Sequence, residues 1–83
     1  MDTREEVRIY IAGRVSEAKR VEELLAHHGI EYTVEIEPYT TRLLGVFPRE
    51  YNGANFYVLS SQGGFCRNLL RKAGLTKGII DEE

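Results

Sequence analysis

Apolar and polar side chains alternate over residues 7–12, near the start of the chain. The residues of one face would be aliphatic, namely Val7, Ile9 and Ile11. The opposite face would carry the larger polar side chains, Arg8 and Tyr10. A period of two with several β-branched residues favours a β-strand. We therefore expect a strand over 7–12 whose aliphatic face is buried.

The pattern changes to a helical period after Ser16, which is a suitable N-cap residue. Residues spaced by three and four positions form one stripe: Ala18, Val21, Leu24, Leu25 and His28. Gly29 followed by Ile30 is typical of a helix end at which glycine adopts a left-handed conformation. The segment therefore predicts an amphipathic helix that stops before Gly29.

Strict alternation returns over residues 30–37, where every even position is apolar and every odd position is polar. This pattern indicates a strand with one buried face and one hydrated face, and Pro38 ends it or places it at a sheet edge. Residues 38–54 then contain two prolines, two glycines and an Asn-Gly turn signal. We expect a long irregular loop with a short helix or a strand extension. A connection of this length in a small domain is often functional.

Residues 55–75 combine an apolar strand, a polar turn and an amphipathic helix. Phe56 to Ser60 is apolar on both faces, which predicts a strand that is covered on both sides. The expected buried stripe of the helix is Phe65, Cys66, Leu69, Leu70 and Ala73. Its expected solvent side is Arg67, Asn68, Arg71 and Lys72. Gly74 and Leu75 repeat the helix stop, and residues 77–81 can form a short final strand.

This order of elements predicts an α/β fold. The preferred architecture is a two-layer ferredoxin-like plait, with an antiparallel or mixed sheet and both helices on one face. The alternative is a thioredoxin-like fold, which has helices on both faces of its sheet. The polar side chains of the first two strands favour the plait, because strands covered on both faces are apolar on both.

A plait leaves one face of its sheet without helices. We expect Arg8, Tyr10 and Thr33 on that face, together with either Tyr57 and Leu59 or Phe56 and Val58. Large side chains gathered there require a cover. The cover would be the loop 38–54, a second copy or another partner. The predicted interface residues are Arg8, Tyr10 and Tyr57. A homo-oligomer, either a dimer or a trimer, is the expected state.

The length of 83 residues suits a single domain over 1–83, with frayed ends at 1–6 and 81–83. The apolar runs are too short to cross a membrane, and the charged N-terminus lacks the apolar region of a secretory signal. The single cysteine, Cys66, has no intramolecular partner for a disulfide. We therefore expect a reduced, cytoplasmic protein.

Charge is distributed unevenly around a formal net charge of −2. Residues 1–37 carry nine acidic and five basic side chains, whereas residues 38–77 carry six basic side chains and one acidic one. A net negative chain gives no electrostatic reason to bind nucleic acid. The basic segment instead favours a small anionic ligand or an acidic protein partner, unless the two halves neutralise each other in the fold.

The turn of Ser60, Ser61, Gln62, Gly63 and Gly64 is the predicted ligand site, because free backbone N–H groups before a helix can bind an anion. The alternative is plain helix capping by its polar side chains. Arginine and tyrosine in loops often serve recognition, and the candidates here are Arg14, Arg42, Arg49 and Tyr51.

No catalytic residue, cofactor or metal is assigned from the sequence. The P-loop and dinucleotide-binding glycine motifs are absent, and no Cys-x-x-Cys accompanies Cys66. Cys66 lies at a helix start, where a thiolate is favoured, but it also belongs to the apolar stripe and is expected to be buried. His27 and His28 are adjacent on a helix and therefore diverge, so a metal pair is not expected. An enzymatic role is not the leading hypothesis.

Several short motifs resemble the small bacterial signal-transducing proteins with a PII-like fold. They are Ile9-Tyr10-Ile11-Ala12, Glu17-Ala18, Leu24-Leu25-Ala26, Gly29-Ile30, Leu44-Gly45 and Phe56-Tyr57-Val58-Leu59. The resemblance implies a ferredoxin-like domain, oligomerisation and a regulatory or ligand-sensing role. In PII-like proteins the loop after the second strand binds partners, and residues 38–54 occupy that place.

A weaker resemblance is to glutaredoxin, through Ile9-Tyr10, Glu23-Leu24-Leu25 and Gly29-Ile30-Glu31-Tyr32. The redox motif of that family would fall at Val15-Ser16-Glu17-Ala18, where both cysteines are missing. Pro48 is a poorly placed counterpart of the family's cis-proline. The leading hypothesis is thus a non-enzymatic binding or regulatory module. The alternative is a thioredoxin-fold protein that lacks the dithiol site and acts in protein binding.

Overall fold

The computed structural model describes residues 5–37, 41–42 and 53–81. Its elements in chain order are β1 (Glu6–Ala12), α1 (Val15–His27), β2 (Thr33–Glu37), β3 (Thr41–Arg42), β4 (Gly53–Leu59), the short 3₁₀ helix η1 (Ser60–Gln62) and α2 (Gly63–Lys72). Arg49 and Tyr51 lie outside the described residues, and only the backbone of Arg42 is described. The predicted loop 38–54 therefore lies mostly outside the described part, although it includes β3 and the first residues of β4.

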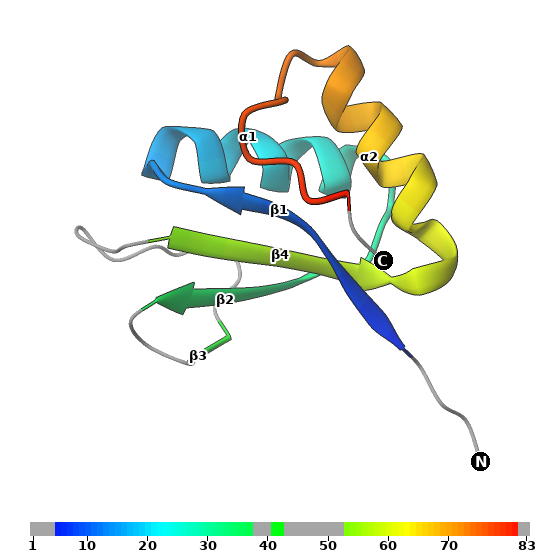
Figure 1. The fold of residues 1–83 in the computed structure, drawn as a ribbon, viewed down its shortest axis with the longest axis horizontal. Helices are drawn as coiled ribbons and strands as arrows, with labels where there is room; N and C mark the ends of the chain where they lie inside the picture. Colours follow the sequence, from blue (N-terminus) through cyan, green and yellow to red (C-terminus); the bar gives the residue numbers. More distant parts are fainter. Residues whose placement is uncertain (1–4, 38–40, 43–52, 82–83) are drawn as a thin grey trace.

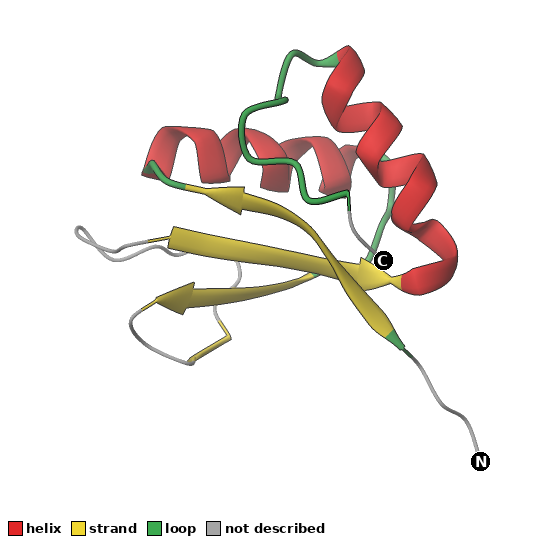
Figure 2. Ribbon diagram, in the orientation of Figure 1, coloured by secondary structure: helices red, strands yellow, loops and turns green. Residues whose placement is uncertain are grey.

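The strands form one antiparallel sheet in the order β1-β4-β2-β3 (Figure 1). The central strand β4 pairs with β1 on one side and with β2 on the other. Both helices lie on the same side of this sheet (Figure 2). The described residues therefore form a mixed α/β fold of two layers, whereas a thioredoxin-like fold would place helices on both sides.

The core fills the space between the sheet and the two helices. Its larger side chains are fully buried: Ile9, Tyr10, Val21, Leu25, Val34, Ile36, Phe56, Val58, Cys66 and Leu70. The α1 stripe is confirmed at Ala18, Val21 and Leu25, whereas His28 is exposed at the helix end. The alternation of residues 30–37 also holds, because Val34 and Ile36 enter this core, but β2 itself begins only at Thr33.

A β-bulge at Ile9 changes the phase of β1. Arg8 pairs with Tyr57, and Tyr10 pairs with Phe56, the adjacent residue of the antiparallel strand β4, so Ile9 is an extra residue in β1. One extra residue in β1 moves every following side chain to the opposite face of the sheet. The prediction that Tyr10 shares the helix-free face with Arg8 is therefore wrong. Tyr10 is fully buried on the helix side, where its hydroxyl donates to the carboxylate of Glu17.

The two helices end in the same local structure, as the sequence predicts. Gly29 and Gly74 have φ values of 69° and 85°, in the left-handed region. After α1, the N–H of Ile30 donates to the carbonyl of Leu25 at 3.0 Å. After α2, the N–H of Leu75 donates to the carbonyl of Leu70 at 2.8 Å. Each is a Schellman motif, which satisfies the last carbonyl groups of its helix.

Two residues of α2 lie on the face opposite to the predicted one. Phe65 is 55% exposed rather than buried, because the buried face of the helix is set by Cys66 and Leu70. Arg67 was expected on the solvent side, but its guanidinium is largely covered by the C-terminal segment. Its Nε donates to the carbonyl of Ile80 at 2.6 Å, and its Nη2 donates to the carbonyl of Arg8 at 3.3 Å.

The segment after α2 returns to the sheet and runs antiparallel to β1. The N–H of Ile11 donates to the carbonyl of Gly78, and the N–H of Ile80 donates to the carbonyl of Ile9, each at 2.9 Å. The expected final strand is thus present as a short bridge centred on the Tyr10 and Ile79 pair. The frayed N-terminal end predicted over 1–6 is too long at its later residues. β1 begins at Glu6, and the carbonyl of Glu5 accepts from the N–H of Ser60.

Neither α1 nor α2 has the length and apolar character that a membrane-crossing helix needs, and the rest of the described chain adds no such helix.

Candidate functional site

The turn of Ser60 to Gly64, the site predicted from the sequence, is taken up by helical structure. Ser60, Ser61 and Gln62 form η1, and Gly63 and Gly64 begin α2. No side chain caps either helix, so the capping alternative is wrong for these residues. A Cβ atom at Gly63 would lie 3.1 Å from Cγ2 of Val7, so the absence of a side chain there permits close packing against β1. Ligand binding at this turn stays a prediction.

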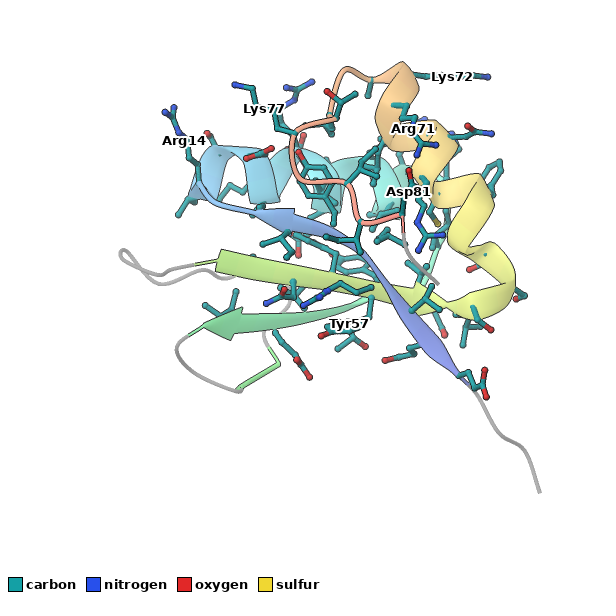
Figure 3. All side chains as sticks on the ribbon, in the orientation of Figure 1. Arg14, Tyr57, Arg71, Lys72, Lys77 and Asp81 are labelled. Carbon is teal, nitrogen blue, oxygen red and sulfur yellow. The ribbon has the colours of Figure 1, made fainter. Side chains whose placement is uncertain are left out.

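The helix-free face of the sheet carries a network of polar side chains. The guanidinium of Arg8 donates to Oδ1 of Asn55, and Nδ2 of Asn55 donates to the carbonyl of Glu35, each at 3.3 Å. Tyr57 lies on the same face, away from both helices (Figure 3). Burial raises the pKa of its hydroxyl, and the nearby carboxylate of Glu35 raises it further. The structure thus brings Arg8 and Tyr57 together without Tyr10, and their role as an interface stays a prediction.

A cleft lies at the opposite side of the molecule, between the start of α1 and the segment that follows α2. Its volume is about 370 Å³. Its walls, which we call the basic cleft, are Arg14, Ser16, Glu17, Arg20, Gly74, Leu75, Thr76 and Lys77. Arg14 and Lys77 come from distant parts of the chain and lie at the same end of the molecule (Figure 3).

The path of the chain explains why these two residues border the same cleft. Arg14 lies two residues after the end of β1 and is the N-cap residue of α1. The left-handed conformation of Gly74 turns the chain away from α2, and Gly78 then binds to β1 through Ile11. Lys77 is therefore held one residue from a fixed backbone contact, beside the end of the strand from which Arg14 emerges.

The charges of the basic cleft are predominantly positive. Among its described wall residues, Arg14, Arg20 and Lys77 are cationic, and Glu17 is the acidic one. The carboxylate of Glu17 accepts a hydrogen bond from the Tyr10 hydroxyl. Burial, followed by this hydrogen bond, raises the pKa of Tyr10 to about 12. Tyr10 therefore stays protonated near neutral pH and keeps its hydrogen bond to Glu17, the acidic residue among the described walls.

The backbone of α1 adds to this positive character. Arg14, its N-cap residue, makes no side-chain capping bond. The carbonyl of Arg14 accepts a hydrogen bond from the N–H of Ala18 at 2.9 Å. The earlier N–H groups of a helix have no intrahelical acceptor and carry the positive end of its dipole. Arg14, Ser16 and Glu17, which lie at this end of α1, are among the walls of the basic cleft.

Arg20 has a structural contact within the cleft. Its Nη2 donates to the carbonyl of Ala73 at 3.1 Å, which links α1 to the C-terminal end of α2. This bond satisfies one of the carbonyl groups that a helix end leaves without a partner. Arg20 is therefore held in place, and Arg14 and Lys77 are exposed.

The thiol and the histidines do not form a reactive centre in this structure. Cys66 is fully buried, and burial raises the pKa of its thiol, which opposes thiolate formation. His28 contacts the carbonyl of Leu24 through Nδ1 at 3.1 Å, at the C-terminal end of α1. Within the ranges 5–37, 41–42 and 53–81, no group of three or more potential metal ligands comes together.

Sequence reasoning counted Arg14 among loop residues and Lys77 within the basic segment, but it did not place them together. The signal that could have found the cleft is topological. A final strand beside the first one brings the residues after the second helix to the residues after the first strand. Comparisons with protein-family models, with curated proteins and with solved structures found no match for this chain.

Proposed function

We propose that this protein is a non-enzymatic regulatory module that binds a small anion in the basic cleft, on a ferredoxin-like plait. The observation that carries the proposal is the convergence of Arg14, Arg20 and Lys77 on one cleft of about 370 Å³. Such a cluster favours phosphate, sulfate or carboxylate groups, since charge-assisted hydrogen bonds are stronger than neutral ones. Recognition by charge, without bond cleavage, is the chemistry that these walls supply.

The plait is supported by the arrangement of the elements. The sheet order β1-β4-β2 places an antiparallel strand between two parallel ones, which α1 connects. Residues 78–80 add to the free side of β1, where a fourth strand of such a plait would lie. Both helices cover the same face (Figure 1).

Titration calorimetry with inorganic phosphate, at low ionic strength, tests the function. We expect saturable binding, together with a rise in the melting temperature as phosphate is added. A ligand at 100 times its dissociation constant stabilises the folded state by about 2.7 kcal/mol. Added sodium chloride should weaken the binding, because exposed charges are screened at about 0.1 M salt.

Arg14→Gln combined with Lys77→Gln is the decisive variant. Both side chains are exposed, so their loss should leave the fold intact, and phosphate affinity should fall by about tenfold or more. The matched control is Lys19→Gln combined with Lys72→Gln, which removes the same charge from exposed helix positions that lie outside the cleft wall. Equal affinity in the two double variants, or no binding to the unaltered chain, would refute the proposal.

A further inference from the structure

A second hollow adjoins the basic cleft, between the later turns of α1 and the end of α2. Its volume is about 360 Å³. Its lining, which we call the α1–α2 groove, is Arg20, Glu23, Leu24, His27, Ala73 and Leu75. The aliphatic side chains here are Leu24, Ala73 and Leu75, and the polar groups of Glu23 and His27 are exposed beside them. This hollow therefore has a different chemical character from the basic cleft.

The two hollows share Arg20 and Leu75 as wall residues. Leu75 is only 4% exposed and so gives both hollows a fixed wall. Arg20 is fixed there by its hydrogen bond to the carbonyl of Ala73 at 3.1 Å. A molecule bound at Lys77 can thus extend past Arg20 along the aliphatic surface of Leu24 without leaving the protein.

From this continuity we propose that the two hollows form one site for an organic anion with an apolar group of aromatic size. The anionic group binds Arg14 and Lys77, and the apolar group lies against Leu24, Ala73 and Leu75. This inference rests on the proposed function and names the class of ligand. Each hollow falls within the range of small-molecule sites, about 300–1,000 Å³, and such sites combine apolar walls with a few polar groups.

The shared arginine fits this class of ligand better than a bare inorganic ion. The planar guanidinium of Arg20 can stack on an aromatic ring while its Nη2 keeps its bond to Ala73. Inorganic phosphate would use only the cationic end of the site. The apolar end would then remain in contact with water, and its contribution to affinity would be lost.

The test compares inorganic phosphate with 1-naphthyl phosphate by titration calorimetry on the full chain. We expect 1-naphthyl phosphate to bind about tenfold more tightly, because burial of its rings adds to the same charge recognition. Leu24→Gln, which retains helix propensity, should abolish that difference and leave the affinity for inorganic phosphate unchanged. Leu59→Gln is the matched control, since Leu59 is also half-buried but lies at the end of β4, outside both hollows.

The outcomes separate this inference from the proposed function. If neither compound binds, the proposed function fails and this inference fails with it. If both bind with equal affinity, or if Leu24→Gln weakens both equally, only this inference is overturned. A measurement without substitutions covers the case in which Leu24→Gln does not fold. In nuclear magnetic resonance spectra, 1-naphthyl phosphate should shift the Leu24 methyl and His27 ring signals, whereas inorganic phosphate should leave them in place, and the absence of that contrast would overturn the inference.

Discussion

The two segments that flank α2 make an instructive comparison. The Ser60 to Gly64 turn before the helix has the composition of an anion cradle, with hydroxyl groups and paired glycines. The Gly74 to Gly78 turn after the helix has an ordinary composition, yet it borders the basic cleft. An anion site needs open space and convergent charge as well as N–H donors. The composition of a segment indicates its hydrogen-bond donors, but only the fold determines whether open space and convergent charge are present.

The difference arises from what each segment meets. The Ser60 to Gly64 segment leads from β4 through η1 into α2. Gly63 packs close to Val7, and the N–H of Ser60 donates to the carbonyl of Glu5. The second crosses from α2 to the edge of β1 and arrives beside the start of α1. Space for a ligand appears at the second segment because two separate parts of the chain meet there without filling the gap.

The largest expected effect comes from Gly78→Ala, which breaks the second segment. A Cβ atom at position 78 would lie 2.1 Å from the carbonyl oxygen of Ile11 and 2.9 Å from Cε2 of Tyr10. The segment must then leave β1, with loss of its two backbone hydrogen bonds and of the packing of Ile79. We expect the free energy of unfolding, measured in urea, to fall by about 2–4 kcal/mol.

Gly13→Ala is the control for that substitution. Position 13 has open space around a new Cβ atom and no left-handed backbone, so the change should be close to neutral. If Gly78→Ala were as stable as Gly13→Ala, residues 78–80 would not pair tightly with β1, and the position of Lys77 would lose its physical explanation.

The next effect concerns the thiol beside the first segment. Cys66→Ser places a hydroxyl in a fully buried apolar site, which should reduce the free energy of unfolding by about 1–3 kcal/mol. In the unaltered protein, a thiol reagent should label Cys66 slowly under native conditions and rapidly in urea. Rapid native labelling would contradict the buried position and would return the first segment to consideration as a reactive site.

Tyr10→Phe probes how the charge of the basic cleft is arranged. Loss of the hydroxyl should reduce the free energy of unfolding by about 1 kcal/mol and leave the carboxylate of Glu17 without this donor. The freed charge should then weaken phosphate binding. Tyr10→Phe combined with Glu17→Gln removes that charge, so it should restore the affinity, and a failure to restore it would show that Glu17 does not act on the ligand.

The same variant has a distinct pH dependence. The pKa of Tyr10 is raised from 10.0 to about 12, so above pH 10 the unfolded chain releases this proton before the folded one does. Stability contributed by the protonated hydroxyl is therefore complete below pH 10 and is lost as the pH rises towards about 12. Urea midpoints measured across that range should fall less steeply in Tyr10→Phe than in the unaltered protein, and equal slopes would contradict the shift.

The smallest effect is expected from Gly64→Ala in the first segment. Position 64 is exposed in the first turn of α2, and a new Cβ atom there meets no other atom within 4 Å. The helix should gain about 0.5–1 kcal/mol, because alanine loses less conformational freedom than glycine. Phosphate affinity should stay unchanged. A clear loss of affinity would identify the Ser60 to Gly64 turn as the ligand site after all, and it would reverse the comparison between the two segments.

Local sequence predicted the elements well where the decisive contacts are local. The ends of α1 and α2 follow from Gly29 and Gly74, since each Schellman motif closes within six residues. The apolar positions of β2 and the inner stripe of α1 follow from the strand and helix periods. In these places the neighbours along the chain determine the conformation.

The sequence alone thus determined where most helices and strands lie and which of their faces are apolar. Only the tertiary structure decided the phase of β1, because the bulge at Ile9 is set by pairing with β4, more than 40 residues away in the chain. It also decided that Arg67 binds the C-terminal segment, and that Arg14 and Lys77 border one cleft. Each of these features depends on contacts between distant residues, and a local pattern of polar and apolar positions carries no information about which distant residues will meet.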